Sequence, residues 1–397
     1  MRTIGATGYA VLGAGLTAVA FGLARYAFGL FVPSIRSELG LGSDVIGVVS
    51  SLAFVSFVCT SAIAPAVAAR LGARRAAMVA SGIGLGGLAL ISQASGAITL
   101  GAGVFACGVS TGLMMPALAA GVQATVRPAL QGRVNAVMNA GTSIGLVFCV
   151  PTVLFLAGAW RLAYGGFAAL AGIGLIAAWW LLPAASRAPR ATDGLPPLTR
   201  LQLGALVRLT LFGFAVGFVG AVFWIFAPDL VVQVGGLAPG TTGLLWLGLG
   251  LAGLLGAGAT DLRDRFGAPK TLATALLATA ASVGGIAAAP GLLPVSLAAA
   301  AVFGWAAMHL SGQLLVTGVR LLPRRPALGP VLPFVSITIG QAAGSPVAGW
   351  AIEGYGYPEA FFAFAVLAVF AAGCSQLYPL PARVIMGPRA ADSPASA

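Results

Sequence analysis

Charged residues are scarce in this sequence. Only 8% of its 397 residues are Asp, Glu, Lys or Arg, whereas a water-soluble domain carries about 25%. Hydrophobic residues make up 59% of the chain, and the mean hydropathy is +1.00. So few charges would not cover the surface of a soluble globule of this size. We therefore expect lipid to surround most of this protein.

Residues that build metal and redox sites are also few. The chain has one histidine and four cysteines, and no two cysteines form a CxxC pair. The usual ligand spacings of a zinc site cannot be assembled from this set, so we predict no metal site and no cofactor. The cysteines all lie in apolar runs, where we interpret them as small packing residues.

The 9 acidic residues lie in loops or near the ends of apolar runs. The resulting net charge of +12 is of the kind found in nucleic-acid-binding proteins. We interpret it instead as basic loops that anchor one side of a membrane protein. The predicted partners are accordingly the lipid bilayer and a small-molecule substrate, with no nucleic acid.

Long apolar runs rich in Ala, Leu and Gly fill most of the chain. Transmembrane β-strands would show segments of about ten residues with alternating polarity, whereas runs of roughly 20 apolar residues predict membrane-spanning helices. The predicted fold class is therefore an all-α membrane protein with twelve transmembrane helices. The expected spans are 8–34, 43–68, 74–92, 97–122, 134–157, 160–182, 205–232, 241–260, 269–288, 292–317, 328–351 and 357–380.

Basic residues give the expected orientation. If the N-terminus is cytoplasmic, this layout puts every Lys and Arg at the cytoplasmic side except Arg25, Arg36 and Arg161. Cytoplasmic loops of membrane proteins are enriched in Lys and Arg, and one missed span would invert every later loop. We therefore predict a multi-pass protein of the cytoplasmic (inner) cell membrane, with both termini cytoplasmic and a first span that is not cleaved.

The longest connection divides the chain into two halves. Residues 183–204 are rich in proline and polar residues, which is typical of a linker. We predict an N-terminal six-helix bundle over 1–182, a cytoplasmic linker over 183–204 and a C-terminal six-helix bundle over 205–381. Residues 382–397 are predicted to form a disordered cytoplasmic tail.

The two halves repeat each other. Short stretches of the first half recur in the second half in the same order and at a nearly constant offset, which indicates two parallel six-helix repeats. The matched pairs are FGLFVPSI (28–35) with FWIFAPDL (223–230), ARLGARR (69–75) with DRFGAPK (264–270), RPAL (127–130) with RPAL (325–328), and GTSIG (141–145) with GQAAG (340–344).

These motifs resemble those of the major facilitator superfamily (MFS) of secondary transporters. The stretch ARLGARR is similar to the superfamily's G-x-x-x-D-R-x-G-R-R loop between helices 2 and 3, and GQAAGSPVAGW resembles its helix 11. The resemblance implies a bacterial-type twelve-helix monomer with two pseudo-symmetric bundles and a gating role for the matched loops. The implied gating residues are Arg70, Gly72, Arg74, Arg75, Asp264, Arg265, Gly267 and Lys270.

Arg25 is a charged residue inside a long apolar run, and hydrophobicity does not explain its position there. A charge at bilayer depth costs at least ~2.5–3.5 kcal/mol, and no acidic residue lies within a span to pair with it. Snorkelling, or capping of carbonyls in a neighbouring helix, would be a structural explanation. The family resemblance instead puts helix 1 beside the central cavity, where a guanidinium suits a carboxylate. We predict that Arg25 binds substrate, with Tyr26 beside it either in the cavity or against a neighbouring helix.

His309 is the second unusual group. Trp305, His309 and Gln313 share one face of helix 10, a helix that lines the cavity in the superfamily that the chain resembles. Because histidine titrates near neutral pH, we predict His309 as a substrate contact and proton-coupling residue; a neutral, backbone-bonded histidine is the alternative. Gln313, Gln341 and Trp224 complete the predicted substrate-binding set, with helix bridging for Gln341 and packing for Trp224 as alternatives.

The leading functional hypothesis is secondary transport of a small organic anion, a carboxylate, by alternating access and proton symport. The alternative is proton-driven efflux of drugs or metabolites with Arg25 structural. Against it, Val104 and Cys107 occupy positions where the drug/proton antiporters of the superfamily that this chain resembles carry Arg and Gln. An intramembrane enzyme would need a nucleophile beside a base, and Ser311 faces away from His309 on their helix. A sensor would need an extra soluble domain. We therefore predict no catalytic residues.

Overall fold

The computed structural model describes residues 5–183, 198–256, 259–322 and 328–377. These residues form helices and turns and contain no strand, so the predicted all-α fold is confirmed. Eleven of the described helices are long and apolar enough to cross a membrane, and the apolar segment Pro239–Leu255 is shorter. That segment corresponds to the eighth expected span, whose continuation runs through residues 257–258, outside the described part.

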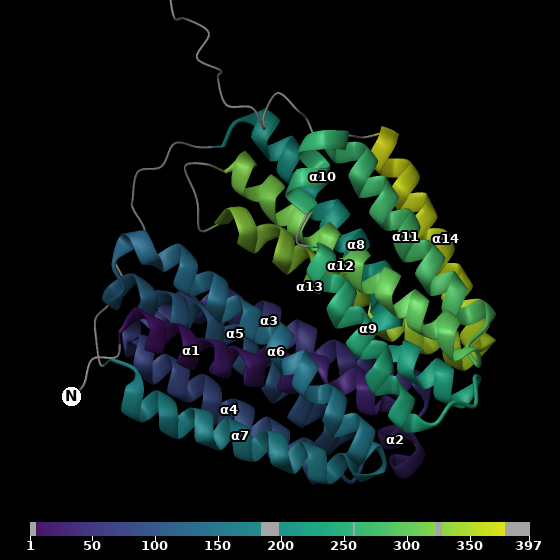
Figure 1. Ribbon diagram of the computed structural model, residues 1–397, viewed down its shortest axis with the longest axis horizontal. Coiled ribbons are helices and arrows are strands. Elements are labelled where there is room, and N and C mark those ends of the chain that lie inside the picture. Colours follow the sequence, from purple (N-terminus) through teal and green to yellow (C-terminus); the bar gives the residue numbers. More distant parts are fainter. Residues whose placement is uncertain (1–4, 184–197, 257–258, 323–327, 378–397) are drawn as a thin grey trace, which may run out of the picture.

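The first half of the chain forms one bundle of helices, drawn in purple to blue in Figure 1. Its elements in order are α1 (Ala6–Thr17), a π-helix η1 (Ala18–Tyr26), α2 (Phe28–Leu39), α3 (Ser43–Leu71), α4 (Ala73–Ser92), α5 (Ala97–Thr125), α6 (Pro128–Leu156), a 3-10 turn η2 (Ala157–Ala159) and α7 (Trp160–Leu181).

The second half forms the other bundle, drawn in teal to yellow. Its elements are α8 (Arg200–Gln233), a 3-10 turn η3 (Pro239–Thr241), α9 (Thr242–Leu255), α10 (Ala259–Phe266), α11 (Ala268–Ala288), α12 (Leu293–Leu321), α13 (Leu328–Tyr355) and α14 (Tyr357–Leu377).

The start of α8 differs from the expected boundary. The helix begins at Arg200 rather than near residue 205, because Thr199 and Gln202 form a reciprocal capping box that satisfies the free backbone N–H groups of the first turn. Most of the predicted linker (183–204) and all of the predicted tail (382–397) lie outside the described residues.

The first span is not one regular helix, contrary to the expectation of a single span over 8–34. The chain changes from α1 to the π-helix η1, bends at Ala27 and continues as α2 to Leu39. Gly22 lies within the wide turns, and a Cβ atom there would be 2.5 Å from the Cα atom of Gly145 in α6. The π-helix therefore packs backbone to backbone against α6, and it ends with Arg25 and Tyr26. Wide π-turns occur preferentially at functional sites.

Two glycines carry the sequence repeat into the structure. Gly72 between α3 and α4 has φ 78° and ψ 157°, and Gly267 between α10 and α11 has φ 88° and ψ 146°. Only glycine adopts this backbone region without strain. The matched loops of the two halves therefore make the same tight turn.

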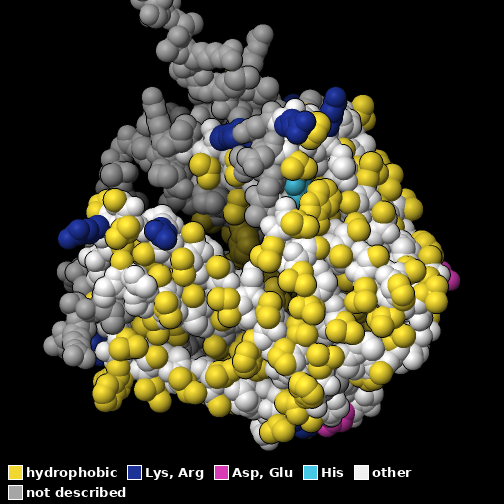
Figure 2. All heavy atoms as spheres, viewed as in Figure 1, with side chains coloured by type: hydrophobic (Ala, Val, Ile, Leu, Met, Phe, Trp, Pro, Cys, Tyr) yellow, Lys and Arg dark blue, Asp and Glu magenta, His cyan; other side chains and the backbone are white. Residues whose placement is uncertain are grey.

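The two bundles touch at one end of the molecule and separate at the other (Figure 1). We call the end with the α2–α3 turn the closed end, and the end with the turns at Gly72 and Gly267 the open end. Figure 2 shows most of the visible Lys and Arg side chains toward the open end, with the surface hollowed between the two halves.

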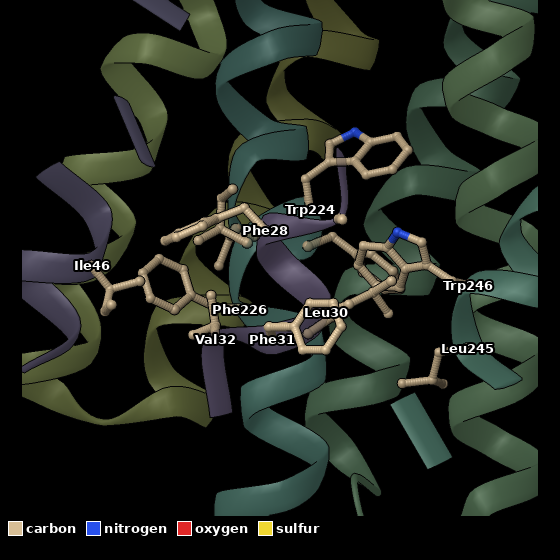
Figure 3. Close-up of a cluster of buried hydrophobic side chains, with 14 of the residues drawn as sticks. Phe28, Leu30, Phe31, Val32, Ile46, Trp224, Phe226, Leu245 and Trp246 are labelled. Carbon is tan, nitrogen blue, oxygen red and sulfur yellow. The ribbon is translucent and has the colours of Figure 1, made fainter. Parts of the chain in front are cut away.

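Small residues and a shared apolar cluster seal the closed end. A Cβ atom on Gly47 of α3 would lie 2.5 Å from the carbonyl oxygen of Ser345 in α13, and one on Gly29 of α2 would collide with the carbonyl oxygen of Trp224 in α8. The adjoining core joins side chains of both halves, including Phe28 and Phe31 of α2, Ile46 of α3, Phe226 of α8 and Trp246 of α9 (Figure 3). Such backbone approach lets dispersion hold helices together in lipid.

We expect Gly47→Val to open the closed end. The added side chain collides with the backbone of α13, and overpacking of this kind costs about 1–3 kcal/mol. Spin labels at the exposed positions Ser37 and Val234, in a background free of native cysteines, will report a longer distance between α2 and α8. Gly82→Val is the matched control, because a Cβ atom there meets nothing within 4 Å. Unchanged label distances in Gly47→Val would contradict this account of the seal.

Candidate functional site

Arg25 lies between the two bundles. Its side chain is 6% exposed, and its Nη2 atom donates to Thr338 Oγ1 at 3.4 Å and to Gln341 Oε1 at 3.3 Å. Both acceptors are on α13, so the guanidinium from the first half is held by neutral oxygens of the second half. The contacts are long for hydrogen bonds, whose usual N···O distance is about 2.9–3.0 Å.

Aromatic rings surround the same guanidinium. The Arg25 Cζ atom lies 4.5 Å from the ring centroid of Phe57, 5.2 Å from Phe54, 5.4 Å from Tyr26 and 5.9 Å from Phe334. Attraction between a cation and an aromatic face contributes about 0.5–2 kcal/mol per contact, with larger values in desolvated sites. The rings offset part of the cost of burying this charge.

Two nitrogens of Arg25 have no partner. Its Nε and Nη1 atoms are buried and make no hydrogen bond in the described structure. The ion pairs among the described residues join other side chains, so no described carboxylate neutralises Arg25. A buried charged donor without an acceptor is costly. An anionic ligand would remove that cost.

A cavity adjoins Arg25 and brings four of the predicted binding residues together. Arg25, Tyr26, Trp224 and Gln341 all line it, and its volume is about 60 Å³. That volume is below the roughly 300–1,000 Å³ that small-molecule sites typically have. The lining comes from η1 in the first half and from α8, α11, α12 and α13 in the second, so the cavity lies between the bundles.

Trp224 forms an aromatic wall of this cavity. Its ring centroid is 5.4 Å from that of Tyr26, 5.5 Å from Phe303 and 6.0 Å from Trp246. Figure 3 shows Trp224 at the edge of the apolar cluster, with its indole turned away from Phe28. Trp224 thus packs against the core with one side and borders the cavity with another.

His309 and Gln313 do not line this cavity. The His309 ring stacks on Trp305 with centroids 5.3 Å apart, and its Nε2 atom is buried without a partner. Its backbone lies against α9, because a Cβ atom on Gly256 would be 3.0 Å from the His309 nitrogen. Gln313 donates to the carbonyl oxygen of Ala268 at 2.7 Å and to Thr271 Oγ1 at 3.0 Å, so it bridges α12 to α11. The shared helix face packs within the second bundle.

The predicted gating residues lie at the open end. Arg70, Arg75, Arg265 and Lys270 are exposed, and Arg74 lies 5.3 Å from the ring of Trp179. The Asp264 side chain lies outside the described part of the structure. Gly72 and Gly267 form the tight turns described above.

Sequence reasoning missed a polar network at the closed end. Asp229 of α8, fully buried, pairs with Arg36 of α2 and accepts a hydrogen bond from the hydroxyl of Tyr357 at the start of α14. Glu353 at the end of α13 also accepts a hydrogen bond from the backbone N–H of Ser43, at 2.8 Å. Both contacts cross between the bundles. The sequence repeat could have pointed to this network. In the repeated stretch FWIFAPDL, Asp229 stands at the position that Ser34 occupies in the first half.

Two helical bundles that enclose a central site and meet at one end are the plan of many secondary transporters. The family model of the Major Facilitator Superfamily matches residues 14–326. The chain therefore belongs to the Major Facilitator Superfamily, and it is a transporter rather than an enzyme.

Solved structures have the same fold at low sequence identity. A bacterial homologue of the human lysosomal transporter Spinster, in an inward-facing and unoccupied conformation, has a TM-score of 0.73 at 16% identity, covering 95% of this chain and 97% of that one. The nucleoside transporter NupG has a TM-score of 0.76 at 14% identity, with 93% and 98% covered. The inward-open xylose transporter XylE from E. coli has 0.73 at 13% identity, with 94% and 96% covered. No curated protein matched the chain.

We expect Asp229→Asn to open the closed end. The variant leaves Arg36 without its carboxylate, and breaking a buried ion pair costs about 3–5 kcal/mol. The distance between labels at Ser37 and Val234 will increase. The double variant Arg36→Asp with Asp229→Arg restores opposite charges and will recover much of the short distance.

Glu38→Gln is the matched control for this network. The Glu38–Arg161 pair, at 2.7 Å, lies at the same end but joins α2 to α7 within the first bundle, and both side chains are partly exposed. Such pairs contribute about 0–1 kcal/mol, so we expect no change in label distance. An equal response to Glu38→Gln and Asp229→Asn would show that the Arg36 network does not hold the bundles together.

Proposed function

We propose that this protein is a secondary active transporter that moves a small organic anion, a carboxylate, across the cytoplasmic membrane. The observation that carries the proposal is the Arg25 guanidinium, which borders the central cavity with two buried nitrogens unpaired. A carboxylate can accept two parallel hydrogen bonds from one guanidinium. Cationic cargo is disfavoured, because no carboxylate is among the described residues that line the cavity.

The distribution of charge supports an orientation with the open end in the cytoplasm. Exposed basic residues of both halves surround the open end, among them Arg70, Arg75, Arg265 and Lys270. Cytoplasmic loops of membrane proteins are enriched in such residues. In this orientation the cavity faces the cytoplasm and the Arg36 network closes the outer side.

Arg25 also links binding to movement of the bundles. Its hydrogen bonds to Thr338 and Gln341 connect η1 to α13, that is, one half to the other. A bound carboxylate accepts from Nη1 and lies between the same two helices. The ligand thus adds contacts between the two halves. These contacts favour closure of the open end, which must precede separation of the halves at the outer end.

Efflux of drugs or metabolites with Arg25 in a structural role is the competing proposal. The bonds from Arg25 to α13 fit that role, because they hold two helices together. They use only Nη2 and leave the other nitrogens unpaired, which a purely structural arginine has no need to do. The two proposals differ in whether Arg25 contributes to anion affinity.

We expect Arg25→Gln to lose at least about tenfold in affinity for transported carboxylates, because a charge-assisted hydrogen bond contributes about 1.5–3 kcal/mol. Uptake of a radiolabelled carboxylate panel into proteoliposomes measures the effect. Arg25→Lys keeps the charge but loses the planar fork, so we expect only partial recovery. Normal carboxylate uptake by Arg25→Gln would end the anion proposal and favour the efflux proposal.

His309 is the proposed proton-coupling residue. Its unpaired Nε2 can accept a proton, and because its ring packs among helices of the second bundle, a change in its charge would act on helix packing. We expect His309→Gln to flatten the dependence of uptake on an imposed pH gradient while substrate binding is kept. Gln313→Leu is the control, because it removes a neighbouring polar group that does not titrate. An unaltered pH dependence in His309→Gln would exclude this route of coupling.

A further inference from the structure

The lining of the cavity beside Arg25 contains polar side chains that have no partner. Tyr26 and Ser311 each contribute a hydroxyl that makes no hydrogen bond within the described structure. Gln341 accepts from Arg25 through Oε1, while its Nε2 donates to no described group. The indole Nε1 of Trp224 also lacks an acceptor among the described residues. A ligand in this cavity therefore meets several unpaired polar groups besides the guanidinium.

The unpaired groups are mainly hydrogen-bond donors. A guanidinium, an indole N–H and an amide NH₂ group can only donate, whereas a hydroxyl can donate or accept. No carboxylate is among the described residues that line the cavity. The lining therefore suits a ligand that offers several acceptor oxygens and few donors.

Ser311 is unusual among the helical hydroxyls of this protein. A serine or threonine inside a helix commonly donates to the carbonyl oxygen of the preceding turn. Thr279 and Thr338 of the lining do so, each at 3.0 Å, and Ser336 on α13 does so at 2.8 Å. Ser311 makes no such bond, although it lies within α12. Its hydroxyl is therefore available to a ligand in the cavity.

The volume of the cavity limits the size of a ligand. The space measures about 60 Å³, and one water molecule needs about 10–15 Å³ of such space. The cavity therefore holds roughly four to six groups of the size of a water molecule. An engineered apolar cavity that binds benzene is larger, at about 150 Å³. The available space thus fits a short polar ligand and excludes an aromatic ring.

We propose that the substrate is a two- or three-carbon monocarboxylate with an oxygen on the carbon next to the carboxylate, as in glycolate, lactate or pyruvate. The carboxylate accepts from Nη1 of Arg25, and the neighbouring oxygen pairs with the hydroxyls of Tyr26 and Ser311. Such acids have about five or six non-hydrogen atoms, which matches the space in the cavity. The inference rests on the proposed function and narrows its substrate class.

Competition binding to the purified full-length protein tests the substrate class. Radiolabelled lactate is the probe, and propionate, lactamide and benzoate are the competitors. We expect propionate, which lacks the second oxygen, to compete at least about threefold more weakly than unlabelled lactate, because the hydroxyls of the lining then stay unpaired. Lactamide, which has no charge, will compete at least about tenfold more weakly. Benzoate, whose ring exceeds the cavity, will also compete at least about tenfold more weakly.

Ser311→Ala and Tyr26→Phe test the two hydroxyls. In each variant we expect lactate affinity to fall at least about threefold and propionate affinity to change less than about twofold, since only lactate has the second oxygen. Ser336→Ala is the matched control, because that hydroxyl donates to the carbonyl oxygen of Leu332 and is not part of the lining. The ratio of the two affinities is measured within each variant, so a lower yield of folded protein does not change it.

The outcomes separate this inference from the proposed function. If propionate or benzoate binds as tightly as lactate and binding depends on Arg25, the anion proposal stands and the narrower substrate class is wrong. If lactamide binds as tightly as lactate and Arg25→Gln has no effect on either, both are wrong. If lactate binds best but Ser311→Ala and Tyr26→Phe leave the ratio of lactate to propionate affinity as it is in Ser336→Ala, the hydroxyls do not recognise the second oxygen and that part of the inference is overturned.

Discussion

The Arg25 guanidinium, buried between two bundles with two of its nitrogens unpaired, is the constraint on which this structure depends. A charge at that depth is tolerated because rings of Phe54, Phe57 and Tyr26 surround it and oxygens of α13 accept from one nitrogen. The π-helix η1 brings Arg25 to that place, since its wide turns pack against α6 through Gly22. The position of the Arg25 side chain thus depends on local backbone geometry, on aromatic packing and on the contact between the halves.

The contacts between the bundles are strong at one end and weak in the middle. At the closed end, glycine-mediated backbone contacts and the buried pair of Arg36 with Asp229 join the halves. Around the cavity, the polar links between the described parts of the bundles are two long hydrogen bonds from Arg25. A molecule built in this way can change its open end while the closed end stays intact. Alternating access then requires a ligand to shift the balance between the two ends, which a charged group at the centre can do.

Much of the fold followed from the sequence because each physical signal was local. Apolar length gave the spans, and the repeated glycine turns at Gly72 and Gly267 reflected a backbone conformation that only glycine adopts easily. The π-helix was not predicted, and its packing involves a contact between Gly22 and Gly145, which are far apart in the chain. Helical spacing correctly put Trp305 beside His309 on one face of α12. Tertiary packing decides which neighbouring helix that face contacts, and spacing alone does not show this. The pairing of Arg36 with Asp229 was hidden for the same reason.

The charge of Arg25 also affects the two forms of the carrier differently, given an anionic substrate. When the cavity is empty, the centre of the protein holds one uncompensated positive charge, and closing the open end over it would remove the remaining solvation. When a monocarboxylate is bound, the centre is neutral and the guanidinium nitrogens are paired. Closing the open end then costs less desolvation free energy. The loaded form therefore changes between its open and closed conformations more easily than the empty form. With an anionic substrate, a residue that destabilises the empty protein thereby becomes the reason that movement depends on substrate.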